Sequence, residues 1–380
     1  MNEIPLFTVH MPHAIDAPLL EVLHSGYIGQ GKKVDQFEKE LAKYLDNENI
    51  LTLNSGTSAI ELALHLSGAK PGKSVVSTPM TCSATNTAIL SRGAEIIWAD
   101  INPKTGLIDP MDAIRKLRKD TVAIIGVDWG GQSCAWSALM GAGTAYGVSV
   151  IEDAAHALGG RYGRRRAGGG QVDFTCFSLQ AIKSITTVDG GILTCKKTSD
   201  YTRGKLLRWY GIDRETPRQD MRCEEDIAEA GWKWHMNDVN ATIGLVQLQY
   251  LEGVVNAQRE NALYYYRNLE GPISAFDSEA ITESPFWLYT ILCENKDQRL
   301  RFMDWMKQRK VMVSQVHARC DKHTCFEAAK AGPLPGVDEF TEKQISIPVH
   351  WKLTETEREY VCESVNMFFT RERANATIES

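Results

Sequence analysis

Short apolar runs alternate with amphipathic stretches over roughly residues 50 to 195. The runs are continuous rather than alternating, which is typical of strands covered on both faces in a parallel or mixed sheet. The pattern predicts strands at Ile50–Leu53, Val75–Thr78, Glu95–Ala99, Val122–Val127, Val148–Glu152, Phe174–Ser178 and Gly191–Cys195. Helical periodicity between them predicts helices at Thr57–Leu66, Ala84–Ser91, Asp109–Leu117 and Ala135–Tyr146.

The pattern changes after residue 200. Tyr201–Arg222 is charged and aromatic and predicts a loop with a helix, whereas Asp238–Glu260 predicts one long amphipathic helix. We therefore expect a large α/β domain over residues 1–260 and a small α+β domain over residues 261–380. In the small domain, the pattern predicts a strand at Trp287–Leu292, a helix at Arg299–Lys310 and a strand at Val311–Val316.

Composition and charge exclude several classes of protein. The 380 residues are 43% hydrophobic and 24% charged, as in globular proteins with a sizeable core. The net charge of −6 lacks the positive field that draws proteins to nucleic acid or anionic membranes. No apolar run approaches the roughly 20 residues that span a bilayer, and the N-terminus lacks secretion features. With nine scattered cysteines, we expect reduced thiols in the cytoplasm.

A first candidate site lies at Asn54–Ser58, between a predicted strand and a predicted helix. Small residues at a helix start leave backbone N–H groups free, and Thr57 and Ser58 add hydroxyl donors. Together with the helix dipole, these groups favour a bound phosphate. The alternative interpretation is an ordinary Ser or Thr helix cap.

Three further segments carry charged residues near predicted strands. Asp153 ends a strand, where a carboxylate can meet a ligand cation or cap the next helix. Lys183 lies in an apolar turn, where burial would lower its pKa and make the amine nucleophilic toward carbonyls; a surface lysine is the alternative. Lys233, between Trp232 and Trp234, suits either a second phosphate contact or cation–π stacking.

Pyridoxal 5′-phosphate (PLP) would use these features together. It offers an aldehyde to a lysine, a pyridine nitrogen to a carboxylate and a phosphate to a helix start. Each signal is weak alone, but the order of phosphate loop, carboxylate and lysine, each after a strand, favours PLP as cofactor.

In this order the motifs resemble the DegT/DnrJ/EryC1/StrS family of sugar aminotransferases. That resemblance implies the type I, aspartate aminotransferase-like fold, with a mixed, mostly parallel sheet between helices and a smaller C-terminal α+β domain. It covers nearly the whole chain, at Leu23–Gly31, Phe37-Glu38, Ser55–Ile60, Thr78-Pro79, Ala84–Asn86, Glu152–His156, Phe177–Lys183, Gly190-Gly191 and Ile347-Pro348.

The resemblance also implies roles for individual residues. Lys183 would bond to the cofactor aldehyde, and Asp153 would pair with the pyridine nitrogen. His156 would lie near the phenolic oxygen of the cofactor. The phosphate would be held by Gly56, Thr57 and Ser178, with Ser58 a further candidate.

Two positions depart from the family pattern. Cys82 stands where many members stack an aromatic ring on the cofactor. Lys233 stands where many members have an asparagine that reaches the cofactor phosphate of the neighbouring subunit, and His235 replaces the arginine that follows. The resemblance therefore implies a homodimer with shared active sites, in which Lys233 keeps the phosphate role.

The activity implied is amino transfer from an amino acid, L-glutamate by resemblance, to a nucleotide-linked keto-sugar. Such reactions serve amino-sugar biosynthesis for polysaccharides or antibiotics. Related sugar dehydratases carry histidine in place of the lysine, so Lys183 favours transamination. A PLP-dependent sugar dehydratase and a non-catalytic member of the fold are the alternatives, and we expect no nucleic acid or membrane partner.

Three other features have competing interpretations. The glycines of Gly159–Gly170 do not follow the Gly-x-Gly-x-x-Gly spacing after a strand, which disfavours a Rossmann oxidoreductase. Arg161, Arg164, Arg165 and Arg166 suit a sugar-nucleotide diphosphate or a solvated loop. His317, Cys320, His323 and Cys325 could ligate zinc, but they are too close along the chain, and the resemblance gives His317 or His323 a place near the substrate; we expect no metal.

Overall fold

The computed structural model describes residues 2–217, 220, 226–271, 273–276 and 280–379. In this part of the chain, a seven-stranded sheet forms the centre, in the order β1-β9-β8-β5-β4-β2-β3. Strand β9 runs antiparallel to both neighbours, and the other pairs are parallel. The strands are β1 (Ile50–Leu53), β2 (Ser74–Ser77), β3 (Glu95–Trp98), β4 (Thr121–Val127), β5 (Ser149–Asp153), β8 (Phe174–Ser178) and β9 (Gly191–Cys195).

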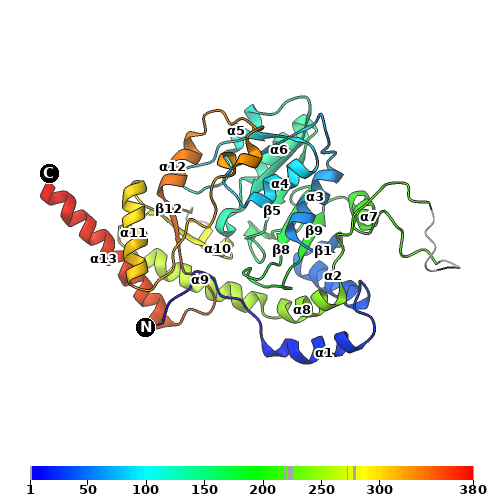
Figure 1. The fold of residues 1–380 in the computed structure, drawn as a ribbon, viewed down its shortest axis with the longest axis horizontal. Coiled ribbons are helices and arrows are strands. Elements are labelled where there is room, and N and C mark those ends of the chain that lie inside the picture. Colours follow the sequence, from blue (N-terminus) through cyan, green and yellow to red (C-terminus); the bar gives the residue numbers. More distant parts are fainter. Residues whose placement is uncertain (1, 218–219, 221–225, 272, 277–279, 380) are drawn as a thin grey trace.

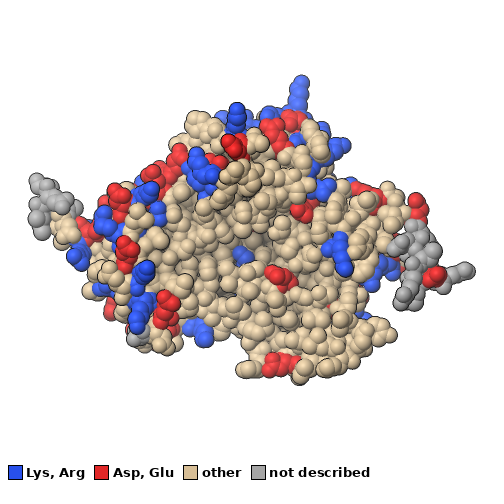
Figure 2. All heavy atoms as spheres, in the orientation of Figure 1, with Lys and Arg blue, Asp and Glu red and all other residues tan. Residues whose placement is uncertain are grey.

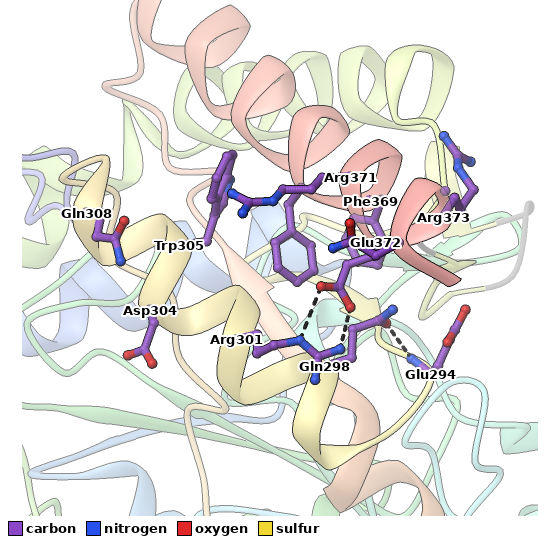
Figure 3. Close-up of a pocket in the computed structure, with 13 residues that line it drawn as sticks. Glu294, Gln298, Arg301, Asp304, Trp305, Gln308, Phe369, Arg371, Glu372 and Arg373 are labelled. Atoms are coloured by element: carbon purple, nitrogen blue, oxygen red, sulfur yellow. Dashed lines mark hydrogen bonds and ion pairs between the residues drawn. The ribbon is translucent and has the colours of Figure 1, made fainter. Parts of the chain in front are cut away.

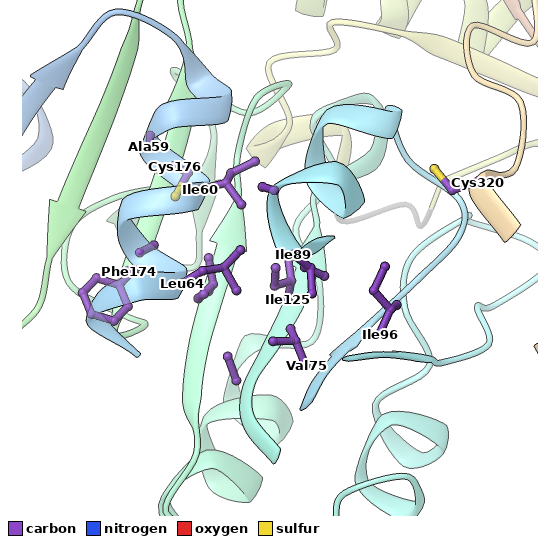
Figure 4. Close-up of a cluster of buried hydrophobic side chains, with 14 of the residues drawn as sticks. Ala59, Ile60, Leu64, Val75, Ile89, Ile96, Ile125, Phe174, Cys176 and Cys320 are labelled. Carbon is purple, nitrogen blue, oxygen red and sulfur yellow. The ribbon is translucent and has the colours of Figure 1, made fainter. Parts of the chain in front are cut away.

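All seven predicted strands of this sheet are confirmed to within one residue at each end. Helices cover both faces of the sheet, which explains the continuous apolar strands (Figure 1). Figure 4 shows the packing of one face, where Ile60 and Leu64 meet Val75, Ile89 and Ile125 in a fully buried cluster. The predicted helices correspond to α3 (Gly56–Leu66), α4 (Ser83–Ser91), α5 (Pro110–Arg115) and α6 (Trp136–Tyr146).

The N-terminal helices α1 (Asp16–His24) and α2 (Lys32–Leu45) pack against α8 (Asp238–Leu248). The buried Asp238 carboxylate ties them together, because it accepts backbone N–H bonds from Gly31 and Val34 at 2.8 and 3.1 Å. It thereby caps the N-terminus of α2.

The prediction of one helix over Asp238–Glu260 is wrong. The chain forms α8 and then α9 (Leu251–Asn268), interrupted at Gln249 and Tyr250. The N-terminal segment docks there: the Gln247 amide bonds to the His10 ring at 2.7 Å and to its carbonyl oxygen, and the His10 ring lies 5.2 Å from the Tyr250 ring. This contact between distant segments leaves no trace in the periodicity.

The segment Tyr201–Arg222 contains both a helix and a loop in its described part. The helix is α7 (Thr198–Leu207), and the loop follows it. Residues 218–219 and 221–222 of the prediction lie outside the described residues.

The C-terminal part contains a three-stranded antiparallel sheet of β10 (Ile273–Ser274), β11 (Tyr289–Leu292) and β12 (Gln344–Ile347). The predicted strand at Val311–Val316 is wrong: Val311 and Ser314 make only isolated bridges to Ile4 and Ser346, and Val316 has a φ of 65°, which breaks extended structure. The remaining elements are the β6 (Arg161–Tyr162) and β7 (Arg165–Arg166) hairpin, α10 (Ala280–Glu283), α11 (Lys296–Gln308), α12 (Pro335–Lys343) and α13 (Glu355–Glu379).

The strand expected at Trp287–Leu292 and the helix expected at Arg299–Lys310 correspond to β11 and α11 with shifted ends. A hydrophobic cluster joins β11, β12, α9, α11 and α13. Phe326, Val337 and Phe340 pack instead into the cluster of the large sheet. The division at residues 260 and 261 stays a prediction. In the described residues, no helix has the length and apolar character needed to cross a bilayer.

Candidate active site

A cavity of about 350 Å³ lies at the carboxyl ends of β4, β5 and β8 and at the N-terminal ends of α3 and α4. This is where open α/β sheets bind their ligands. Most of the predicted site residues line it, although they come from four separate stretches of the chain: Gly56, Thr57, Cys82, Asp153, His156, Ser178 and Lys183.

One end of the cavity is built to hold an anion. Ser55 caps α3 by accepting the Ser58 N–H at 3.0 Å, which leaves the N–H groups of Gly56 and Thr57 at the helix start. A side chain at Gly56 would come within 3.0 Å of the Ser178 β-carbon, so glycine lets the helix start approach β8. The helix dipole adds partial positive charge at this point.

Ser58 lies behind this end rather than in it. Its hydroxyl group donates to the Asn54 side-chain oxygen at 2.7 Å and contacts the Ser55 hydroxyl at 2.8 Å, and Ser58 does not line the cavity. The sequence predicted it as a further phosphate contact, whereas these bonds make it a support for the loop.

Lys183 brings a buried amine into the cavity. Its Nζ lies 3.8 Å from the centre of the Trp287 ring. The Trp287 indole N–H donates to the Ile182 carbonyl oxygen at 2.9 Å, which fixes the orientation of the ring. Burial lowers the pKa of Lys183 to about 8, against the opposing effects of Asp153 and Cys82. The neutral fraction of the amine near pH 7 is therefore far larger than that of an ordinary lysine, and the neutral amine is the form that attacks carbonyls.

Asp153 ends β5 and is 3% exposed. Its carboxylate accepts from the Thr85 hydroxyl at 2.7 Å and from the Ala155 N–H at 3.2 Å. Burial raises the pKa of Asp153, while these two bonds and Lys183 oppose the rise. A carboxylate held in this way, with a single lysine nearby, gains from a further cation in the cavity.

His156 presents a neutral imidazole. Its Nδ1 faces the Gly130 N–H at 3.4 Å, so Nδ1 is the acceptor and the proton is assigned to Nε2. The ring stacks on Trp287 at 3.9 Å. Burial, together with Lys183 and His317, holds the pKa of His156 well below its usual range. His156 is therefore a hydrogen-bond donor that carries no charge.

Sequence reasoning missed Trp287 as a site residue, although it flanks both Lys183 and His156. The only signal was an aromatic residue at the start of a predicted strand. His317 lines the cavity, and its buried Nε2 has no partner among the described residues. Burial and Lys183 lower the pKa of His317 to about 4. His323, the other histidine proposed for the substrate, is exposed and does not line the cavity.

Lys233 lies outside the cavity of its own chain and is exposed. Its carbonyl oxygen accepts from the Asn54 side chain at 3.2 Å, which places the Lys233 backbone beside the anion-binding end. Trp232 and Trp234 stack on each other at 4.3 Å, and Arg92 lies over Trp232. In the described part of the chain, the cation that stacks on Trp232 is therefore Arg92.

The arginine run forms the β6–β7 hairpin. Arg166 bonds to Glu252 at 2.7 Å and to the Tyr44 hydroxyl at 2.8 Å, and no arginine of the run lines the cavity in the described part of the chain. No three His, Cys, Asp or Glu side chains of the described residues are placed to hold a metal ion. Cys320 is buried and Cys325 is exposed.

The donor set of the cavity fits PLP. An anion site, a low-pKa lysine, a buried carboxylate and a neutral histidine donor match its phosphate, aldehyde, pyridine nitrogen and phenolic oxygen. On a mainly parallel sheet with a smaller C-terminal unit, this arrangement defines an enzyme of the type I PLP-dependent class.

The comparisons identify the family. Residues 11–366 match the model of the DegT/DnrJ/EryC1/StrS aminotransferase family, and the chain belongs to it. The chain is therefore a transaminase, and the family implies PLP as its cofactor.

Individual relatives match this chain over nearly its whole length, and those with solved structures share its fold. The crystal structure of AtS13 from Actinomadura melliaura is 36% identical, with a TM-score of 0.90, and the match covers 97% of this chain and 99% of AtS13. The sugar aminotransferase CalS13 from Micromonospora echinospora is 31% identical, with a TM-score of 0.89 and coverage of 96% and 99%. The UDP-4-amino-4,6-dideoxy-N-acetyl-beta-L-altrosamine transaminase of Campylobacter jejuni is 30% identical over 92% of this chain and 93% of its own.

Proposed function

We propose that this transaminase transfers an amino group from an amino acid, L-glutamate by family resemblance, to a nucleotide-linked keto-sugar. The names of two relatives, a sugar aminotransferase and a UDP-amino-sugar transaminase, support a sugar acceptor. The single observation that carries the proposal is the joint placement of Lys183 and Asp153 in one buried cavity.

Each residue has a role set by its surroundings. With PLP bound, Lys183 would hold its aldehyde end and, when the amine is free, would move a proton to and from the carbon that carries the amino group. Its pKa of about 8 lets it both accept and give up that proton near neutral pH. The cofactor supplies an electron sink that stabilises negative charge at that carbon. Asp153 keeps the ring nitrogen protonated.

The remaining residues would orient the cofactor and neutralise its charges. Gly56, Thr57 and Ser178 line one end of the cavity, where the two N–H groups and the hydroxyl would hold the phosphate. His156 would donate from Nε2 to the phenolic oxygen. Cys82 and Trp287 supply contacts on the cavity walls, and Trp287 gives the aromatic surface that Cys82 does not.

The reaction class can be separated from its alternatives by two assays on one protein. The PLP-loaded enzyme is mixed with glutamate alone, and then with glutamate and a panel of nucleotide keto-sugars, with products scored by mass. Transamination predicts 2-oxoglutarate in the first assay and an aminated sugar in the second. A dehydrated sugar, or no reaction in either assay, would exclude the proposed function.

The proposed assembly is a homodimer in which each subunit supplies Lys233 to the phosphate end of the other. Figure 2 supports it, because charged side chains gather toward the edges of the face shown while its centre, over α8, α9 and β8, carries few. Faces depleted of charge are typical of interface cores. Light scattering measures the assembly directly, and Lys233→Ala should weaken PLP binding without dissociating the dimer.

We also propose a cytoplasmic location. All eight described cysteines are free thiols, as expected in a reducing compartment.

A further inference from the structure

Two carboxyl groups lie buried beside the cavity but do not line it. Asp128 directly follows β4, and Glu152 precedes Asp153 in β5. Their exposed fractions are 0% and 2%, so neither reaches solvent. The proposed transamination uses neither of them. Two buried acids side by side require an explanation because unpaired buried charge is costly.

The hydrogen-bond donors around the two groups are too few for two ionised carboxylates. Asp128 Oδ1 accepts the Cys134 N–H at 2.9 Å, but Oδ2 has no donor among the described residues. Glu152 Oε2 accepts the Thr175 hydroxyl at 2.7 Å, and the Gly168 backbone also hydrogen-bonds to the Glu152 carboxyl. The side chains within hydrogen-bonding reach of Asp128 are the Cys134 thiol, a weak donor, and Glu152 itself, which is an acceptor when ionised.

The charges around the pair also disfavour two ionised carboxylates. The ionisable groups with the largest effects on the two carboxyls are each other, Asp153 and the Cys134 thiol, and none of these is a cation. The thiol donates to the Val127 carbonyl oxygen at 3.3 Å. A proton between the carboxyls would give Asp128 Oδ2 a bond and would leave one negative charge instead of two.

We propose that Asp128 and Glu152 share one proton and act as a single positioning unit for the turn that follows Asp128 and, through it, for His156 in the cavity wall. The chain of contacts is short. The Asp128 N–H donates to the Asp153 carbonyl oxygen at 3.1 Å, and the Asp128 carbonyl accepts the Gly131 N–H at 3.0 Å.

The turn held in this way, Trp129–Gly131, supports His156. Gly130 directs its N–H at His156 Nδ1, and the Trp129 ring stands edge-on to the His156 ring at 6.2 Å. Asp128 is therefore a positioning residue, since it acts on the cofactor site only through this turn.

Burial and the Glu152 charge hold the pKa of Asp128 well above its usual range. The sign of the pH effect follows. Folding favours the protonated form, so the pair stabilises the fold most at acid pH. That stabilisation is lost as the pH rises above the ordinary aspartate pKa of about 3.9 toward the raised value.

The test compares Asp128→Asn with the full-length wild-type protein in urea denaturation between pH 5 and pH 9. The asparagine amide keeps the Cys134 contact and donates permanently to Glu152. The wild-type folding constant should fall, relative to the variant, by up to about tenfold per pH unit. The wild-type infrared difference spectrum should also show a protonated carboxyl band that the variant lacks. A pH-independent difference without that band would overturn the proposal.

Two further variants locate the proton. Cys134→Ala should leave the pH difference unchanged; if it abolishes the difference, the thiol supplies the proton and the proposal fails. Asp128→Ala removes the donor and should be less stable than Asp128→Asn at every pH; equal stability of the two would contradict the shared proton.

The consequence for activity rests on the proposed function, and there Asp128→Asn should keep turnover while Asp128→Ala lowers it. The denaturation and infrared measurements need no cofactor. Failure of the proton-sharing pair therefore appears there, whereas failure of the proposed function appears as missing products from glutamate and the keto-sugars.

Discussion

The cavity at the strand ends and the groove between α11 and α13 are two hollows with opposite character. The groove is the larger, at about 1000 Å³ against about 350 Å³. The largely exposed Arg301 side chain is paired with Glu372, and the neutral Gln298 side chain accepts the Glu294 backbone N–H (Figure 3). The cavity instead buries Lys183 and Asp153. The volume of a hollow therefore does not identify the active site. Buried charged groups that a bound ligand can pair with do identify it.

This contrast follows from topology. Parallel strands end together, so loops from distant parts of the chain meet at one edge of the sheet. The groove is formed by two helix surfaces, where long side chains find partners in solvent. Exposed pairs of that kind contribute little, whereas buried groups have shifted pKa values and can do chemistry.

The largest expected effect comes from removing the buried lysine of the cavity. Lys183→Ala should abolish transamination because no other amine faces the cavity in the described residues. The exposed Lys330→Ala serves as matched control and should retain wild-type turnover. Both rates are measured as 2-oxoglutarate formed from glutamate. Turnover in Lys183→Ala would break the assignment of the cavity as the active site.

The next effect compares one acid from each region. Asp153→Asn should lower the rate by about 100- to 1,000-fold, the size typical for removal of one preorganised electrostatic group. Asp304→Asn, on the rim of the groove, should leave the rate unchanged. Steady-state kinetics and PLP affinity are measured for both. Equal rates for the two variants would contradict a catalytic role for the buried acid that the exposed acid lacks.

The pH dependence tests the amine itself. Because burial lowers the pKa of Lys183 to about 8, covalent capture of PLP by the cofactor-free protein should speed up as the pH rises. The neutral fraction of the amine increases about tenfold per unit below that pKa and levels off above it. Stopped-flow absorbance gives the rate constant. A rise that continues beyond pH 10 would indicate an ordinary lysine.

A smaller effect concerns strain at the cavity rim. Val188 has a φ of 73°, which is unfavourable for a β-branched residue, and two bonds from the Asn240 side chain to the Thr187 and Asp189 carbonyls hold it there. Asparagine tolerates this conformation, and the Val188 side chain is 53% exposed. Val188→Asn should therefore stabilise the protein by about 1 kcal/mol in urea denaturation. Destabilisation would show that the valine side chain makes an important contact.

The smallest effect belongs to the groove. Arg301→Ala should cost less than about 1 kcal/mol of stability, as for other exposed ion pairs. It should leave transamination unchanged, because Arg301 lies outside the catalytic cavity. Thermal denaturation and the glutamate assay check both points. A large loss of activity would show that the groove takes part in catalysis.

Features encoded locally could be predicted from the sequence. The buried strands appear in the sequence as apolar runs. The ends of these strands fix the positions of the site residues at or after them, which are Gly56, Asp153 and Lys183. The order of these motifs was enough to indicate the cofactor.

Features that depend on distant contacts could not be predicted. At the break between α8 and α9, His10 docks against Gln247 from more than two hundred residues away in the chain. Trp287 reaches the cavity because Phe7 stacks on it at 4.8 Å and Ile182 accepts its indole proton. No local pattern in the chain encodes these pairings.

The most direct test is chemical trapping of the bound cofactor. The PLP-loaded protein is reduced with borohydride, digested, and searched by mass spectrometry for the modified lysine. We predict that the pyridoxyl group is found on Lys183 and not on Lys233 or on any exposed lysine. A group bonded elsewhere, or none at all, would contradict the assignment on which the proposed function rests.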